Sequence, residues 1–271
     1  MKKHMSTIFL CLILLIGLSL LLYPTFSNWW NSFHSSQAIS TYSEQVANLD
    51  DNKYNEIWNA AWEYNQKLLE RHNSYVLSEE TLKTYRELLN INDSGVMGYV
   101  EIPSLGVALP VYHGTDDAVL QVAVGHLEWT SLPVGGESAH CVVSGHRGLP
   151  SARLFTDLDK MAIGDIFWFR ILDEILTYEV DQIRIVKPDE TEDLLVEEGK
   201  DLCTLVTCTP YGINSHRLLV RGHRVENQEV AKTVRVTADA MQIAPVIVAP
   251  FLAAPVLVLL MIMLIIPKNK K

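Results

Sequence analysis

The sequence predicts a mainly β domain, either a barrel or a sandwich, which follows a helical segment and lies between two membrane-spanning segments. Three observations lead to this fold class: short β-type runs between turn residues from residue 98 onward, helical periodicity before it, and an apolar run near each end. The 271 residues suffice for one domain with a substantial core. A net charge of −10 offers no basic surface to a phosphate backbone, so we expect no nucleic-acid partner.

The first apolar run, residues 8–23, carries no charge and follows Lys2 and Lys3. Its length of about 16 residues is close to the ~17–25 residues with which a helix crosses a bilayer. The next residues, PTFSNWW, contain no small-residue cleavage site, and tryptophan favours the membrane–water boundary. We therefore predict an uncleaved signal-anchor over residues 1–25.

The second apolar run, residues 243–266, precedes the basic tail PKNKK and contains three prolines, which spanning helices tolerate. A polar linker, residues 228–242, leads to it, so a second transmembrane helix with a short tail is predicted over residues 243–271. Because basic residues stand at both extremities, the positive-inside rule places both termini in the cytoplasm and the domain between them outside the cell. The alternative for either run is a buried core helix.

Residues 26–96 are predicted to form an extracellular helical segment, with helix over 37–93. Apolar side chains recur at helical spacing from Tyr54 to Leu69, and Ser78 followed by two acidic residues is typical of a helix start. We expect the aromatic stripe of this segment to pack on the main domain.

The main domain is predicted over residues 97–227. Its candidate strands are rich in β-branched and aromatic residues and are bounded by turn residues. They cover residues 99–102, 107–112, 140–144, 166–171, 176–180, 183–186, 202–207 and 217–221. One helical interruption is expected at 152–161.

The stretch from Asp201 to Arg224 carries the strongest chemical signal. Alternation places Cys208 at the end of a strand, and the TPYG sequence that follows predicts a turn before a second strand, which begins at Arg217. A thiol and an arginine at two adjacent strand ends suit acyl transfer, provided that a histidine transfers protons. His146, which follows a strand and a glycine in VVSGHRG, is the best candidate for that histidine.

Other residues compete for these roles, and Arg221 is the alternative to Arg217. Among the histidines, His140 lies in the middle of a predicted strand, so we expect it in the core. The rival histidines are His113, His126, His140, His216 and His223.

A zinc site built on Cys203, Cys208, His140 and His146 is a further alternative, which we reject. The Cys-x₄-Cys spacing is looser than that of zinc fingers, and strand alternation turns Cys203 and Cys208 to opposite faces. Cys141 and Cys203 are expected to be core residues, and their spacing does not establish a disulfide. We expect no metal and no cofactor.

Residues 207–222, TCTPYGINSHRLLVRG, resemble the active-site signature of class C sortases, the pilin polymerases of Gram-positive bacteria. The segments GYVEIP from Gly98, GHLEWTSLPVGG from Gly125 and SGHRG from Ser144 resemble other parts of that family's catalytic domain. The similarity covers roughly residues 97–224. It implies a closed sortase-like barrel of about eight strands, with N-terminal helices and a transmembrane helix at each end.

The resemblance also implies the chemistry of the site. Cys208 would be the nucleophile, His146 the general acid and base, and Arg217 the group that holds the peptide and stabilises the oxyanion. The substrate would be an LPxTG-like sorting signal, cut between Thr and Gly, and the acceptor a lysine amine of a pilin subunit. The candidate substrate-binding residues are Thr207, Tyr211 and Asn214.

The sequence departs from the family at the lid that commonly covers the active site. Class C sortases build this lid around an Asp-Pro-aromatic tripeptide ahead of the barrel, whereas no Asp-Pro occurs anywhere in this sequence. We therefore expect the usual lid anchor to be absent from residues 70–96. The cleft would then be more open, or gated by the N-terminal helices.

Three other functions stay open at this point. They are a sortase that joins surface proteins to a cell-wall precursor, a non-catalytic membrane scaffold for pilus assembly, and a hydrolytic cysteine protease. The C-terminal anchor and the TPYGxNxHR loop favour pilin polymerisation over wall anchoring. The joint presence of Cys208, His146 and Arg217 argues against a scaffold, and no papain- or caspase-like context accompanies the cysteine.

Overall fold

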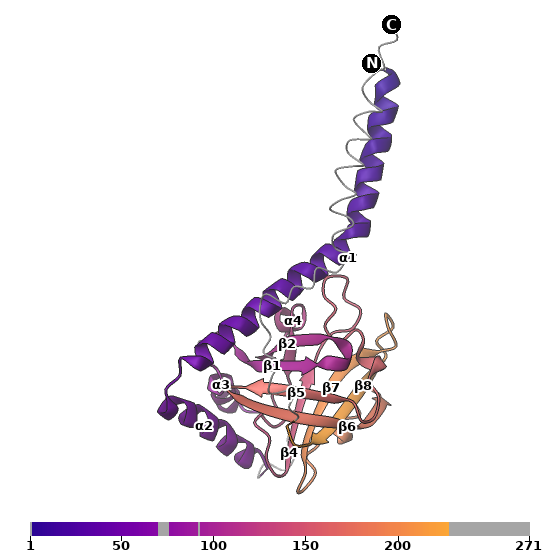
Figure 1. The fold of residues 1–271 in the computed structure, drawn as a ribbon. Coiled ribbons are helices and arrows are strands. Elements are labelled where there is room, and N and C mark those ends of the chain that lie inside the picture. The colour runs from indigo at the N-terminus through magenta and orange to yellow at the C-terminus, as the bar shows by residue number, and fades with distance from the viewer. Residues whose placement is uncertain (1, 70–75, 92, 228–271) are drawn as a thin grey trace.

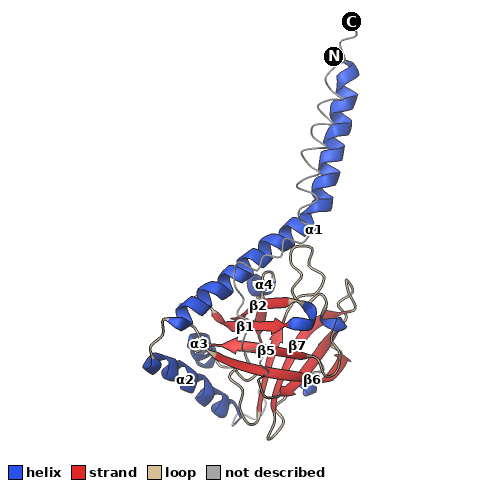
Figure 2. Cartoon of the chain, viewed as in Figure 1, coloured by secondary structure: helices blue, strands red, loops and turns tan. Residues whose placement is uncertain are grey.

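A computed structural model of the chain describes residues 2–69, 76–91 and 93–227. Three N-terminal helices lead into a closed barrel of eight strands, so the predicted fold class is confirmed for this part (Figures 1 and 2). The predicted linker, 228–242, and the predicted second membrane span, 243–271, lie outside the described residues.

The helices are α1 (Lys2–Ala47), α2 (Asp51–Leu69), α3 (Glu79–Glu87) and the short α4 (Asp117–Leu120), with 3₁₀ turns at Pro103–Leu105, Leu158–Lys160 and Glu192–Leu194. The strands are β1 (Val96–Ile102), β2 (Val107–His113), β3 (Val124–His126), β4 (Ala139–Ser144), β5 (Ile166–Ile171), β6 (Glu174–Val186), β7 (Asp201–Thr209) and β8 (His216–Arg224).

The barrel closes in the order β1-β2-β3-β4-β7-β8-β6-β5. β4 runs parallel to β7, and β2 runs parallel to β3, whereas the other neighbours are antiparallel. Consequently β4 and β7 finish at the same end of the barrel, where β8 begins. This end is called the site end below, and the opposite end is the far end.

The helix α1 is continuous over 46 residues, and Pro24 lies inside it. Its apolar part, which begins at Ile8, has a mean hydropathy of 2.5 and is long and apolar enough to cross a membrane. Figure 1 shows a bend in α1, with the N-terminal half projecting away from the barrel and the C-terminal half lying along it. A proline removes one intrahelical hydrogen bond, which favours such a bend.

The helices α2 and α3 are attached to the far end of the barrel by buried polar contacts. The Asn65 side chain donates from Nδ2 to the carbonyl of Leu132 (3.0 Å) and accepts from the amide of the same residue (2.7 Å). Tyr85, which is fully buried, places its hydroxyl 3.0 Å from Nδ1 of His126 and accepts a hydrogen bond from the amide of Gly114. Each contact satisfies polar groups that would be costly to bury alone.

The predicted start of α3 is confirmed. Ser78 is its N-cap, and the hydroxyl accepts from the amide of Thr81. The helical character predicted over 37–93 is confirmed for the described residues, and it is divided among the end of α1 at Ala47, α2 and α3. The aromatic stripe of α2 does pack on the domain, with Ile57 and Trp58 against the barrel core.

Three other predictions of secondary structure need correction. The runs at 176–180 and 183–186 belong to one strand, β6, in which a bulge between Val180 and Gln182 shifts the register without ending the strand. The strand β3 escaped prediction because three residues are too few to show alternation. The helix expected at 152–161 is wrong, since only the turn Leu158–Lys160 is helical there.

Side chains from all the longer strands fill the barrel. Val100, Val143, Phe167, Leu205 and Val220 are each fully buried in this interior cluster. The alternate residues of the same strands point outward. This period of two decides which side chains can reach a substrate outside the barrel.

Candidate active site

Cys208 and Arg217 are direct neighbours across two strands. Cys208 is the penultimate residue of β7, Arg217 is the second residue of β8, and the antiparallel register pairs the two. Directly opposed residues of an antiparallel pair project from the same face of the sheet. The thiol and the guanidinium are therefore on the outer face at the site end, and Cys208 is half-buried there.

His146 reaches the same end from β4. The parallel register of β4 and β7 pairs Ser144 with Val206, and two hydrogen bonds continue this pairing beyond the strand. The amide of Gly145 donates to the carbonyl of Val206 (3.0 Å), and the hydroxyl of Thr207 donates to the carbonyl of Gly145 (2.7 Å). His146, the next residue, is thus held beside the strand end that carries Cys208.

The requirement for glycine at position 145 is steric. A Cβ atom there would lie 2.8 Å from the ring of Phe155 and 2.9 Å from a methyl group of Val124. Such distances are shorter than carbon atoms tolerate, so any side chain would push this turn away from β7. The chain therefore turns toward Cys208 only with glycine before His146.

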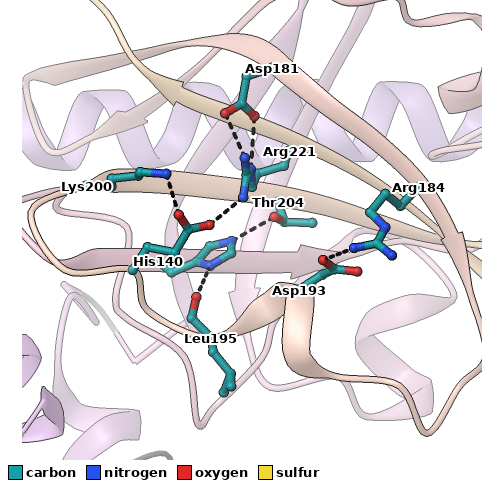
Figure 3. A network of polar contacts seen from close by, with 9 residues as sticks. His140, Asp181, Arg184, Asp193, Leu195, Lys200, Thr204 and Arg221 are labelled. Carbon is teal, nitrogen blue, oxygen red and sulfur yellow. Dashed lines mark hydrogen bonds and ion pairs between the residues drawn. The ribbon is translucent and has the colours of Figure 1, made fainter.

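Arg217 and its rival Arg221 differ in their partners. The guanidinium of Arg217 donates only to the main-chain carbonyls of Asn214 (3.3 Å) and His216 (3.1 Å), and no carboxylate among the described residues pairs with it. Arg221 forms two hydrogen bonds with Asp181 (3.0 and 2.9 Å) and one with Glu197 (2.6 Å) (Figure 3). The positive charge of Arg221 is neutralised by two carboxylates of the protein. The positive charge of Arg217 is not, so this guanidinium can bind an anionic group at the site.

The polar network in Figure 3 fastens the connection between β6 and β7 to the outer face of the barrel. Arg184 pairs with Asp193 in this connection (2.6 Å), and the ring of His140 on β4 contacts the carbonyl of Leu195 (2.8 Å). Glu197 joins the network through Arg221 and Lys200. The connection therefore forms a fixed wall beside β4 and β7.

A small apolar core lies between this wall and the strands. Val142, Val186, Leu194, Val206 and Leu219 are buried together there, with Leu127 and Trp129 at the edge. Val206 precedes Cys208 by two residues and Leu219 follows Arg217 by two, so this cluster continues the outer face on which the site lies. The buried cluster fixes the wall to the strands beside the site.

Arg147 is a residue of the site that the sequence reasoning passed over, although it follows His146 directly. Its side chain is one-tenth exposed, pairs with Asp159 (2.5 Å), and stacks on the ring of Tyr211 at 5.9 Å. The ring also lies against Gly148, where a Cβ would approach it to 3.0 Å. Arg147 and Tyr211 thereby join the turn after His146 to the turn between β7 and β8.

The three candidate substrate-binding residues occupy different environments. Tyr211 is 61% exposed, and Asn214 is exposed with a positive φ of 59°. Thr207 is 1% exposed, and its hydroxyl is used by Gly145. Tyr211 and Asn214 are open to a ligand, whereas Thr207 is placed to hold the turn that carries His146.

The rival histidines are placed away from Cys208 or are occupied by structural contacts. The expected burial of His140 is confirmed, because the residue is 1% exposed, with Nε2 2.8 Å from the hydroxyl of Thr204 beneath the connection between β6 and β7. Burial lowers the pKa of His140, and the same cause lowers that of His113, whose ring contacts the carbonyls of Leu88 and Gly95. His126 is buried, and its ring contacts Tyr85 and Ser131. His223 is exposed toward the far end. The ring of His216 contacts the hydroxyl of Ser215.

The four residues of the rejected zinc reading do not share one face. Cys203 is fully buried in the barrel interior opposite Cys141, whereas Cys208 is on the outer face. Both interior cysteines are free thiols, and burial raises the pKa of Cys203 well above its usual range, which makes that thiol a poor nucleophile. Across residues 2–69, 76–91 and 93–227, no three His, Cys, Asp or Glu side chains are grouped as metal ligands.

The lid prediction concerns a region that the structure describes only in part. Residues 70–75 and 92 lie outside the described residues. The described helices α2 and α3 contact the far end through Asn65 and Tyr85, so neither helix reaches across the strand ends that carry Cys208 and Arg217. The absence of the usual lid anchor stays a prediction.

Comparison with known proteins agrees with this geometry. A family model described as the sortase domain matches residues 100–225. Sortase D of Bacillus subtilis is 30% identical over 131 residues, which are 47% of this chain and 63% of that protein. The chain thus spans less than two thirds of this curated relative.

Solved structures match over a larger share of their length. The crystal structure of sortase C1 from Streptococcus agalactiae is 52% identical with a TM-score of 0.69, covering 71% of this chain and all of that one. Streptococcus pneumoniae sortase C is 43% identical with a TM-score of 0.63, covering 70% of this chain and 97% of that one. With a sortase barrel, a cysteine at the end of β7 and an arginine opposite it on β8, the chain belongs to the sortase family of cysteine transpeptidases, and within it to the class C sortases.

Proposed function

We propose that this protein is a membrane-anchored transpeptidase that cleaves an LPxTG-like sorting signal between Thr and Gly and joins the new carboxyl end to a pilin lysine. The observation that carries the proposal is the convergence of Cys208, His146 and Arg217 at one end of the barrel from three separate strands. A Clostridium perfringens sortase C of similar fold, 43% identical, has been solved with the C-terminal cell wall sorting motif, which supports a substrate of that kind.

The acylation step uses the thiolate of Cys208. It attacks the carbonyl carbon of the threonine residue, and the oxyanion that develops is stabilised by the guanidinium of Arg217, whose charge is not neutralised by a described carboxylate. Collapse breaks the Thr–Gly amide bond, and the imidazolium of His146 gives its proton to the departing amine. The products of this step are a thioester on Cys208 and a free glycine amine.

The transfer step regenerates the enzyme. A lysine amine attacks the thioester, neutral His146 accepts the proton that the amine loses, and the thiolate of Cys208 departs. The new bond is an isopeptide bond between threonine and lysine. The leucine and proline of the sorting signal would lie on the outer face of the barrel next to Cys208, beside the wall that the connection from β6 to β7 forms.

The proposed location follows from α1. Its apolar part would anchor the chain with the N-terminus in the cytoplasm, so that the barrel lies on the outer side of the membrane. The second span, predicted over residues 243–271, would return the C-terminus to the cytoplasm. Pilin subunits that carry the sorting signal and an acceptor lysine are the proposed partners.

Incubation of the full chain in detergent or vesicles with an LPxTG peptide and a lysine-bearing pilin tests the proposal. The expected result is a Thr–Lys isopeptide adduct, identified by mass spectrometry, that is absent with Cys208→Ala. Cleavage without transfer would identify a hydrolase, and transfer only to a cell-wall precursor would identify an anchoring sortase. A folded protein without any turnover would favour the scaffold.

A further inference from the structure

Hydrogen bonds at both ends of the barrel fix the direction in which α1 crosses it. At the site end, Asn28 accepts from the amide of Arg153 (2.8 Å), and Asn31 donates to the carbonyl of Ser151 (2.7 Å). At the far end, the hydroxyl of Tyr42 donates to the carbonyl of Met97 (2.9 Å). The helix therefore runs from the site end to the far end as the chain proceeds. Its preceding apolar residues project beyond the site end (Figure 1).

Large apolar side chains are exposed at this same end of the barrel, and four of them stand out. Ile163 (62% exposed) lies before β5, Ile185 (64%) lies near the end of β6, and Tyr211 (61%) and Ile213 (72%) lie in the turn between β7 and β8. These four residues are called the apolar rim. Exposed apolar groups gathered at one end of a water-soluble domain indicate a contact surface.

Charge does not distinguish the two ends of the barrel. The turn at residues 210–215 in the rim has no charged residue, and in the connection from β4 to β5 Arg147 pairs with Asp159 while Arg153 and Lys160 pair with Asp157. The connection after β6, however, carries the exposed acids Asp189, Glu190 and Glu192 next to Ile185. The direction of α1 is therefore the feature that sets the site end apart.

We propose that the apolar rim rests on the surface of the lipid bilayer in which α1 is anchored, so that the active site opens at the membrane interface. Apolar and aromatic side chains are stable among lipid headgroups. The direction of α1 places the rim toward the membrane and the far end away from it. Asn28 and Asn31 hold the site end against the part of α1 that directly follows the apolar run at residues 8–23, so this end lies close to the membrane boundary.

The proposal depends on anchoring through α1, and it does not depend on the transpeptidase reaction. Its consequence for the enzyme is geometric. Tyr211 and Ile213 belong to the turn that joins Cys208 to Arg217, so a substrate tethered to the same bilayer would meet these residues without leaving the surface.

Photo-crosslinking of the full chain in vesicles tests the contact without any turnover. Ile213→benzoylphenylalanine and Ile163→benzoylphenylalanine are compared with Trp62→benzoylphenylalanine, because Trp62 is 46% exposed on α2 next to Gly136 at the far end. The vesicles contain phosphatidylglycerol and alkyne-tagged phosphatidylethanolamine, and flotation selects the chains that are inserted.

The expected result is lipid labelling at positions 213 and 163 at least about tenfold above position 62. Equal lipid labelling at all three positions would overturn the proposal, since it would show random collision with the membrane. Crosslinks at 213 and 163 to protein alone would overturn it as well and would indicate a protein partner. All three positions are exposed, so the substitutions leave the packing of the core unchanged.

Discussion

Asn31 in the membrane-proximal part of α1 donates a 2.7 Å hydrogen bond to the carbonyl of Ser151, which lies 120 residues further along the chain. Asn28, one helical turn earlier, accepts from the amide of Arg153. The segment they hold begins just after His146, and the amide of Phe155 returns to the carbonyl of His146 (3.2 Å). The anchor helix thereby supports the turn that positions the proposed general acid.

The two asparagines predict opposite responses to the same substitution. Asn28→Asp keeps the oxygen that accepts from Arg153, so activity should stay within about twofold. Asn31→Asp removes the donor and places a carboxylate against the carbonyl of Ser151. We expect it to lower kcat/KM about tenfold, less than the ~10²-fold that a 1 Å displacement can cost. The measurement is transfer kinetics in the full chain.

A matched control for this pair is Asn55→Asp. Asn55 donates to the carbonyl of Asp51 on the exposed surface of α2, so its replacement should leave the kinetics unchanged. Equal losses for the two aspartate variants at 28 and 31 would contradict a positioning role.

Thr207 is predicted to act through His146 and not through the substrate. Thr207→Val keeps the shape of the buried side chain and removes the hydroxyl that donates to Gly145. We expect kcat to fall about 10- to 100-fold with little change in KM, because the substitution displaces the proposed general acid and leaves the exposed residues Tyr211 and Asn214 unchanged. Thr207→Ser, which restores the donor, should recover most of the rate. A rise in KM alone would instead favour direct contact with the peptide.

Substitution of Arg217 should affect the rate of catalysis, whereas substitution of Arg221 should affect the stability of the fold. Arg217→Ala is expected to lower kcat by ~10²–10³, the usual loss for one oxyanion donor, with the Tm almost unchanged. Arg221→Ala removes the partner of Asp181 and Glu197, both of them partly exposed, and should lower the free energy of unfolding by about 1–2 kcal/mol. Denaturant unfolding together with transfer rates measures both. The interpretation fails if Arg221→Ala loses as much kcat as Arg217→Ala.

The lowered pKa of His140 leads us to expect a loss of stability in mild acid. Burial keeps its pKa below the usual value, with Arg221 lowering it further and Glu197 and Asp181 opposing the shift. The unfolded chain therefore binds this proton at a higher pH than the folded chain does. Neutral His140 contributes fully to the free energy of unfolding above about pH 6.5, the pKa of histidine in the unfolded chain. This contribution is lost as the pH falls from there toward the lower pKa that His140 has in the folded chain.

Thermal unfolding at about pH 7.5 and about pH 5.5 measures this effect. The difference in Tm should be smaller in His140→Gln than in the unmodified chain, since glutamine can contact Leu195 and Thr204 without titrating. His223→Gln is the control, because His223 is exposed. An unchanged pH dependence in His140→Gln would show that other groups, such as the buried His113, account for the whole loss.

Local pattern was sufficient for much of the site. Alternation from Leu202 to Cys208 predicted which side of β7 the thiol occupies, and the TPYG turn predicted that Arg217 opens the return strand. These features depend on neighbouring residues only, so periodicity and turn chemistry are enough to find them. The capping of α3 by Ser78 was predictable for the same reason.

The features that escaped prediction depend on residues far apart in the sequence. Nothing next to Asn31 or Asn65 indicates that each binds a loop, at Ser151 and at Leu132, because the pairing exists only once the helices pack on the barrel. The different partners of Arg217 and Arg221 also depend on residues far apart in the sequence. Both stand on one strand with similar neighbours, and only the bulge at Asp181 and the position of Glu197 decide which cation is neutralised.

The sequence by itself determined the candidate nucleophile, its strand, the apolar helix near the N-terminus and the family, because each is encoded in a continuous run of residues. Only the tertiary structure decided that β4 delivers His146 to Cys208, that Thr207 supports this turn, and that the site end of the barrel faces the same way as the anchor. The physical reason is barrel closure. It brings together strands that are separated by tens of residues, and no local pattern records which of their ends will meet.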